Sequence, residues 1–206
     1  MLKIKHFIQK SWLLIVASFC FGLLIAVTNA ALLPRIEQNE KNKLNDLMRG
    51  LIKDANSFEI IIEKLEITGQ KNKILTTNIY QAFNSNNKNA GFAFIAVGPG
   101  FADKIKLVIA VDSACEKFLG FNVLASNETP GFGSKIKDDF FGNQFIGVPA
   151  EKIELTKIGN AEEIDNKIVA ISGATVSSEA VVEIFNTYIE QVKKQLKQKG
   201  LISNDG

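Results

Sequence analysis

The chain has 206 residues, the length of one ordinary domain with an additional segment. Apolar residues make up 46% of the sequence and charged residues 22%, so the composition is that of a globular protein and excludes an intrinsically disordered one. The net charge of +2 is too small for a nucleic-acid-binding surface, which normally shows a strong basic excess, so we expect no nucleic-acid partner.

The scarce residue types limit the chemistry further. The only histidine is His6, so the rest of the chain has no imidazole for a catalytic triad or a histidine-based zinc site. The two cysteines, Cys20 and Cys115, are too few and too far apart in the sequence for an iron–sulfur cluster. We therefore assign no metal site and no catalytic residue, and a redox function would depend on an organic cofactor.

An uncharged stretch near the N-terminus predicts a membrane anchor. Residues 11–33 form a run of 23 residues without a charge, long enough as a helix to cross a hydrocarbon core of about 30 Å. Three lysines within residues 1–10 predict a cytoplasmic N-terminal stub, which places the remaining chain outside the cytoplasm. A cleaved secretory signal is the first alternative, with small residues at 29–31, and a buried core helix is the second.

Residues 34–56 are predicted to form a stalk helix, with Pro34 ending the membrane segment. The apolar positions recur at helical spacing, with Glu, Lys and Asn between them. Residues 57–206 then form the outer domain, which begins with a segment, 57–67, that is compatible with either a strand or a helix.

Short apolar runs bounded by turn residues predict an antiparallel β-meander in the outer domain. A polar hairpin loop at 84–89 and a turn at 98–100 separate some of these runs. A loop-rich segment follows over 127–149, and 152–158 is a further candidate strand. The four predicted strands are Ile79–Phe83, Gly91–Val97, Ile105–Asp112 and Phe118–Ala125.

The C-terminal segment Ser177–Lys199 has the clearest helical pattern. Its apolar residues share one face, Ser177 is expected to cap the start, and Gly200 is expected to stop the helix. The lysines of its last turns match the negative end of the helix dipole, and we interpret them as a solvated face in preference to a membrane or nucleic-acid patch. The predicted fold class is α+β: an N-terminal transmembrane helix, a stalk helix, and an antiparallel β-rich domain with a C-terminal helix.

Two motifs have the composition of ligand-binding segments. The first, Ser172–Ser178 (SGATVSS), precedes the last helix, where small residues and free N–H groups favour a phosphate, with the Thr175 hydroxyl beside it. The second, Glu128–Gly133 (ETPGFG), combines a Pro-Gly turn with Phe132, whose ring is available for stacking on a planar ligand. A simple helix cap and a plain surface turn are the respective alternatives.

Taken together, the anchor, the β-rich domain and these two motifs in this order resemble the FMN-binding subunit family. That family includes the G subunit of the Rnf-type electron transport complex and the C subunit of the sodium-pumping NADH:quinone reductase. The resemblance covers nearly the whole chain, and the chain length is closer to that of the Rnf-type protein. The sequence departs from the family pattern at Val169, where an aspartate is common, and at 126–127, where a histidine is common.

The resemblance implies a cofactor and the residues that bind it. FMN would be attached covalently to Thr175 through a phosphoester, installed by a dedicated flavin transferase. Ser172, Gly173 and Ala174 would form the adjoining recognition and phosphate-contact segment. The residues expected near the flavin from the second motif are Glu128, Thr129, Pro130, Gly131 and Gly133.

The implied function is that of an electron-transfer subunit in a membrane-bound, ion-translocating ferredoxin:NAD oxidoreductase of Rnf type. Such a protein would be a single-pass protein of the cell inner membrane, with a cytoplasmic N-terminus, a periplasmic main domain and other membrane subunits as partners. Two alternatives within redox chemistry are the C subunit of a sodium-translocating NADH:quinone reductase and a stand-alone flavinylated carrier. A non-redox, membrane-anchored binding domain is the alternative from another class.

Overall fold

The computed structural model describes residues 2–69 and 72–203. The chain divides between Lys43 and Leu44 into two compact units.

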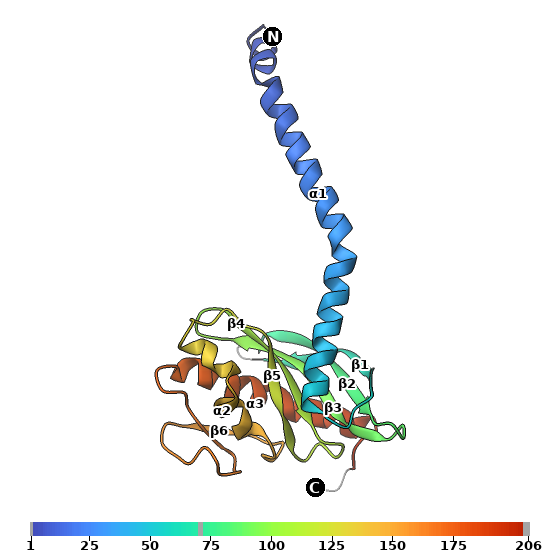
Figure 1. Ribbon diagram of the computed structural model, residues 1–206, viewed down its shortest axis with the longest axis vertical. Helices are drawn as coiled ribbons and strands as arrows, with labels where there is room; N and C mark the ends of the chain where they lie inside the picture. Colours follow the sequence, from blue (N-terminus) through green and yellow to red (C-terminus); the bar gives the residue numbers. More distant parts are fainter. Residues whose placement is uncertain (1, 70–71, 204–206) are drawn as a thin grey trace. The chain divides into compact units, whose positions relative to one another are not determined.

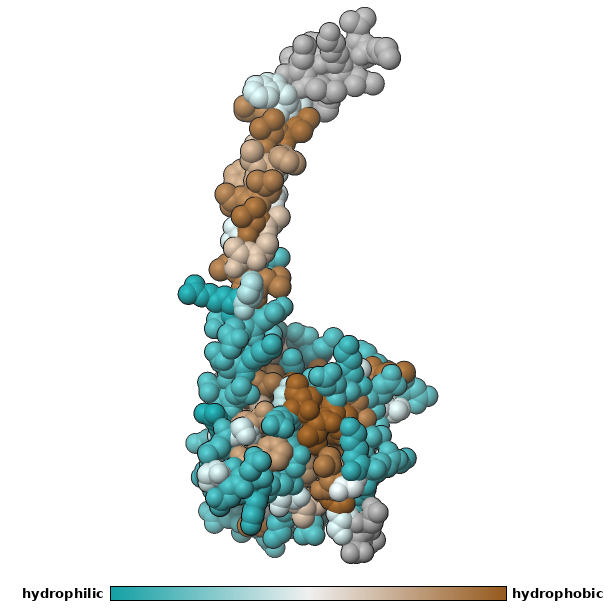
Figure 2. Space-filling model, turned by 90° about the vertical axis from the view of Figure 1, so that its right-hand side faces the viewer, coloured by the Kyte–Doolittle hydropathy of each residue, from teal (hydrophilic) through white to brown (hydrophobic). Residues whose placement is uncertain are grey.

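The N-terminal unit consists of helix α1, which runs as one element over Leu2–Leu51 and continues into the second unit. The predicted helix break at Pro34 is wrong, because this proline lies inside α1. Over residues 12–42 the side chains are exposed, and Figure 2 shows the apolar segment as a brown column. A buried core helix is therefore excluded, and within the described residues this is the one helix long and apolar enough to cross a membrane.

The second unit contains a five-stranded antiparallel sheet whose strands follow chain order (Figure 1). The predicted meander is confirmed, and the ambiguous segment 57–67 is its first strand. Strands β2 and β3 pair from Phe83–Asn89, next to their connecting loop, to Ile79–Phe94. Their pairing ends there, so the described residues before Ile79 and after Phe94 are not paired with each other. The strands are β1 (Ser57–Thr68), β2 (Ile74–Phe83), β3 (Asn89–Pro99), β4 (Lys104–Val111) and β5 (Phe118–Ala125).

Helices cover both faces of the sheet. Alternation along β3 sends Phe92 and Phe94 toward the long C-terminal helix α3 (Thr175–Gln198), and sends Ala93 toward the last turns of α1. Residues 44–51 of α1 pack on that second face, where Met48 is fully buried. Since both faces are covered, the apolar residues of the central strands are buried on either side, which explains their nearly continuous apolar runs.

The segment between β5 and α3 forms short elements around an aromatic cluster. Phe121, Phe145 and Phe185 pack mainly edge-to-face, with ring centroids 4.7–5.5 Å apart. The candidate strand at 152–158 is confirmed as a three-residue strand, and it pairs in parallel with a strand that the sequence did not predict. These elements are η2 (Gly133–Lys137), α2 (Asp139–Gly142), η3 (Asn143–Phe145), β6 (Glu154–Thr156) and β7 (Lys167–Val169).

Cys115 occupies a buried turn between β4 and β5, and burial raises the pKa of its thiol to about 11. At pH 8 only about one thiol in a thousand would be ionised, and the thiolate is the reactive form. We therefore expect a Cys20→Ser protein to resist thiol-directed reagents at pH 8 until it is unfolded by denaturant. Stoichiometric labelling within minutes in the absence of denaturant would show that Cys115 is accessible and ionised.

Candidate functional site

Helix α3 begins two residues earlier than predicted. Thr175 is its first residue and Ala174 is its N-cap, so the expectation that Ser177 caps the helix is wrong. The reason is that Ser177 and Ser178 lie inside the first turn and point inward. The Ser178 hydroxyl donates to the Ala174 carbonyl at 3.0 Å and accepts from the Ile171 N–H at 3.0 Å, which fastens the preceding segment to the helix.

Thr175 is the hydroxyl residue at the open end of this helix. Its side chain is half-buried, and among the residues that the structure describes its Oγ1 atom has no hydrogen-bond partner. The backbone N–H groups of Thr175, Val176 and Ser177 also have no acceptor within the described part of the chain. Unpaired N–H groups and the positive end of the helix dipole favour an anion beside the Thr175 hydroxyl.

The second motif meets the same turn through a buried carboxylate. Glu128 is only 6% exposed, and its Oε1 atom accepts from the Ala102 N–H at 3.0 Å. Its Oε2 atom accepts from the Ser177 hydroxyl, across 49 residues of sequence. Glu128 therefore ties the loop that it begins both to the β3–β4 turn and to the start of α3.

The remainder of the Glu128–Gly133 loop is a surface turn. Gly131 has a φ of +77°, which favours glycine, and its N–H donates to the Ser134 hydroxyl at 2.9 Å. Thr129 and Pro130 are exposed, and the Thr129 carbonyl accepts from the Phe132 N–H at 3.2 Å. The predicted Pro-Gly turn is present, and it displays Phe132 on the surface.

Gly133 lies where no side chain fits. A Cβ atom at this position would lie 2.6 Å from the Ser177 hydroxyl and 2.7 Å from the Glu128 Oε2 atom. We expect Gly133→Ala to lower the free energy of unfolding by about 2 kcal/mol, because overpacking forces these buried groups apart. Urea unfolding of the full-length protein in detergent measures this change.

Gly142→Ala is the matched control for that variant. Gly142 has a helical φ of −62°, and a Cβ atom there would meet nothing within 4 Å. Equal unfolding midpoints for the two variants would contradict the close approach of the loop to α3.

The two motifs line one groove of about 470 Å³ at the start of α3. Thr129, Gly133, Gly173, Ala174 and Thr175 all contribute to its lining, as the sequence predicted for residues around a common ligand. Ser172, Pro130 and Gly131 are exposed and lie outside this lining, and Glu128 lies buried behind it.

Three residues of this groove were missed as site residues in the sequence. Phe101 and Val176 line it with exposed fractions of 67% and 53%, and Ser177, which was expected only as a cap, also contributes to the lining. A large aromatic residue directly after the Gly98–Gly100 segment was the available signal for Phe101, since exposed aromatic residues at turns often contact ligands. The turn lies later than the predicted 98–100, because Gly98 and Pro99 still pair with β4 in the sheet. It spans residues 100–103 and is closed by the Gly100 N–H, which donates to the Asp103 carbonyl at 2.8 Å.

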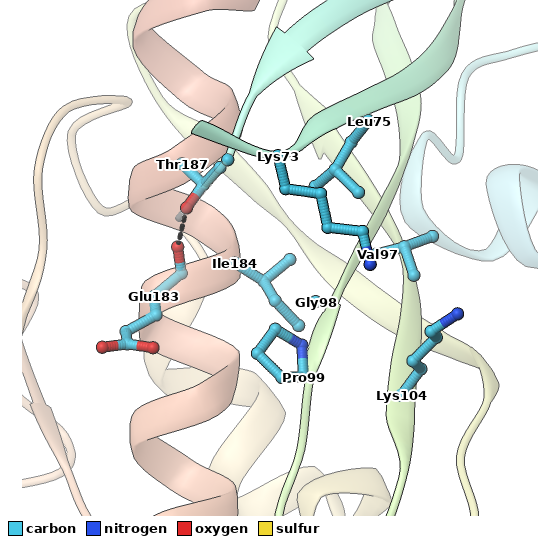
Figure 3. Close-up of a pocket in the computed structure, with 10 residues that line it drawn as sticks. Lys73, Leu75, Val97, Gly98, Pro99, Lys104, Glu183, Ile184 and Thr187 are labelled. Atoms are coloured by element: carbon cyan, nitrogen blue, oxygen red, sulfur yellow. Dashed lines mark hydrogen bonds between the residues drawn. The ribbon is translucent and has the colours of Figure 1, made fainter. Parts of the chain in front are cut away.

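A second cavity, of about 280 Å³, opens on the other side of the β3–β4 turn. It lies where β2 and β3 separate over α3, and Ile184, Leu75 and Val97 surround it (Figure 3). Lys73 and Lys104 also line this cavity (Figure 3). None of the sequence-predicted site residues lines this cavity, so the groove at Thr175 is the candidate site.

Known proteins resemble this chain over most of its length. It is 28% identical to the G subunit of the proton-translocating ferredoxin:NAD(+) oxidoreductase complex of Clostridium ljungdahlii, over 87% of this chain and 88% of that protein. It is 27% identical to the G subunit of the ion-translocating oxidoreductase complex of Methanosarcina acetivorans, over 88% and 92% of the two chains.

Solved structures share the fold. NqrC of Shewanella oneidensis superposes with a TM-score of 0.57 at 20% identity, covering 71% of this chain and 73% of the other. The C subunit of the Na(+)-translocating NADH-quinone reductase of Parabacteroides distasonis gives 0.54 at 19% identity, covering 83% and 98%. The sequence model of the FMN-binding domain family matches residues 100–190, which include both motifs. The resemblance inferred from those motifs is thus confirmed, because the model of the FMN-binding domain family matches the segment that contains them.

Proposed function

We propose that this protein is the FMN-carrying electron-transfer subunit of a membrane-bound, ion-translocating ferredoxin:NAD(+) oxidoreductase complex. The observation that carries the proposal is the likeness, along 87–88% of the chain, to the G subunits of a proton-translocating ferredoxin:NAD(+) oxidoreductase complex and of an ion-translocating oxidoreductase complex. The match of the FMN-binding domain model to residues 100–190 supports it. The likeness to quinone-reductase proteins, at 19–20% identity, concerns the fold alone, so the G subunit is the better-supported assignment.

The groove at the start of α3 fits a flavin nucleotide. A phosphate at the helix N-terminus would accept from the unpaired N–H groups of Thr175, Val176 and Ser177. Phe101 and Phe132, with exposed fractions of 67% and 58%, present apolar ring surface to a planar ring system within the same groove. FMN, when bound, supplies the redox chemistry, while the residues of this chain hold its phosphate and flank its ring.

We assign the covalent attachment to Thr175. Thr175 is half-buried and lines the groove, whereas the Ser177 and Ser178 hydroxyls are buried and hydrogen-bonded. The new bond joins Thr175 Oγ1 to the flavin phosphorus and the threonine loses its proton. Because ester formation needs a leaving group, the donor is a flavin nucleotide whose FMN phosphate is joined to a second nucleotide by a phosphoanhydride bond. That P–O bond breaks, and the second nucleotide departs with its electron pair. A flavin transferase would catalyse this step.

The exposed apolar helix suits a protein that works at a membrane. We propose that residues 11–33 span the cell inner membrane, that the stub at 1–10 is cytoplasmic, and that residues 57–206 lie in the periplasm after the stalk at 34–56. Lysines before the apolar run support this orientation. A covalent link would then prevent loss of the cofactor outside the cytoplasm.

Purification of the tagged, full-length protein from membranes of its native host tests the proposed function. We expect other membrane subunits to co-purify and the preparation to reduce NAD(+) with reduced ferredoxin. Co-purification with a quinone-reducing complex, or purification without partner subunits from gently solubilised membranes, would contradict the assignment.

A further inference from the structure

The Glu128 side chain lies buried behind the groove, and its hydrogen-bond partner Ser177 is a buried residue of the groove lining. Their exposed fractions are 6% and 3%. Both carboxylate oxygens of Glu128 already have partners from this chain: the Ala102 N–H on one oxygen and the Ser177 hydroxyl on the other. Glu128 is therefore unsuited to contact a flavin directly, although the resemblance places its motif near the cofactor.

Two glycines enclose the carboxylate of Glu128. A Cβ atom on Gly100 would lie 2.5 Å from its Oε1 atom, and one on Gly133 would lie 2.7 Å from its Oε2 atom. The backbone of the β3–β4 turn and that of the second motif thus approach the same carboxylate from two sides. Such close approach leaves the Glu128 side chain little freedom to move.

Each principal residue of the groove is a near neighbour of one of these contacts in the sequence. Phe101 lies between Gly100 and Ala102, Phe132 precedes Gly133, and Thr175 lies two residues before Ser177. The three segments come from different parts of the fold. Glu128 accepts hydrogen bonds from the first and third of these segments, and the backbone at Gly133 approaches its carboxylate closely.

We propose, on the basis of the function proposed above, that Glu128 and Ser177 are positioning residues that hold the flavin ring of the attached FMN in one orientation. Their side chains act by fixing Thr175 relative to Phe101 and Phe132, without contacting the flavin ring. A phosphoester to Thr175 alone does not orient the ring, because several rotatable bonds of the ribityl chain lie between them. Hydrogen bonds made by buried residues that do not touch the ligand are a general means of fixing the residues that do.

The test compares the visible circular dichroism of the bound flavin in full-length variants that carry equal amounts of covalent flavin. A hydrogen bond to a charged acceptor is strong enough to change the population of an ordered turn by about tenfold. We therefore expect Ser177→Ala to lose most of the induced signal, and Ser177→Thr to recover it by restoring the hydroxyl. Glu128→Met is a second variant, since its side chain has a similar length and no oxygen to accept from either partner.

Thr77→Val is the control for a lost buried hydroxyl elsewhere. Thr77 is 4% exposed and its hydroxyl donates to the Ile95 carbonyl in the sheet, away from the groove. We expect this variant to keep the flavin signal of the wild type.

A wild-type signal in Ser177→Ala or Glu128→Met would overturn the positioning role, as would an equal loss in Thr77→Val. Failure of both site variants to fold, with Thr77→Val folded, would assign the pair a purely structural role and also overturn it. Failure of the proposed function looks different, because the wild-type protein itself would then carry no covalent flavin.

Discussion

Replacing Thr175 by alanine is expected to abolish covalent flavin attachment completely. The substitution removes the Thr175 hydroxyl from the first turn of α3, while Ser177 and Ser178 remain engaged in buried hydrogen bonds. Co-expression with a flavin transferase, followed by a denaturing gel viewed for flavin fluorescence, measures the effect. The wild-type band should fluoresce and the Thr175→Ala band should be dark.

Thr187→Ala is the matched control for this experiment, because Thr187 lies on the same helix and outside the groove. Its hydroxyl donates to the Glu183 carbonyl at 2.8 Å, within the helix. The band of this variant should fluoresce like the wild type, and Thr175→Ser should retain at least part of the fluorescence because it keeps a hydroxyl. An undiminished band in Thr175→Ala would move the attachment to another residue.

Replacing Glu128 by alanine is expected to lower the free energy of unfolding by about 3 kcal/mol. The change leaves the Ala102 N–H and the Ser177 hydroxyl without their acceptor, and hydrogen bonds to a charged group contribute about 1.5–3 kcal/mol each. It also empties a site that Gly100 and Gly133 enclose. Urea unfolding of the full-length protein in detergent, followed by circular dichroism, gives the free energy.

Glu163→Ala removes the same side chain from an exposed position and is the control. We expect it to change the free energy of unfolding by less than about 0.5 kcal/mol. Similar values for the two variants would mean that the Glu128 carboxylate does not hold the loop, the β3–β4 turn and α3 together.

Local sequence patterns were sufficient to predict most of the second unit. The runs at 79–83, 91–97, 105–112 and 118–125 are strands because β-branched and aromatic residues alternate or cluster between turn residues. Strand β7 and its parallel pairing with β6 were not predictable, because β7 has only three residues and its partner lies beyond a loop. Such short runs show no measurable periodicity.

The start of α3 was placed wrongly for a non-local reason. A serine before an apolar helical face is a normal cap, but Ser177 has a carboxylate partner 49 residues away and lies inside the helix. In the same way, a proline usually ends a helix, whereas Pro34 lies within α1. The motif residues were nevertheless found, because their small side chains and hydroxyls are a local signal for a ligand-binding turn.

Val169, where the sequence departs from the family pattern, makes its hydrogen bond with Gln144 through the backbone, which an aspartate could also do. This residue ends β7, and its N–H donates to the Gln144 side chain at 2.7 Å. The Thr175 hydroxyl is not altered by that substitution, so we expect attachment to proceed without the aspartate.

The mass of the protein isolated from its native host tests the account most directly. We expect the intact chain to exceed its polypeptide mass by one FMN less one water, and fragmentation of the tryptic peptide at 168–193 to place that increment on Thr175. A peptide at 168–193 whose mass equals that of its amino acids alone would contradict the covalent flavin and the function built on it.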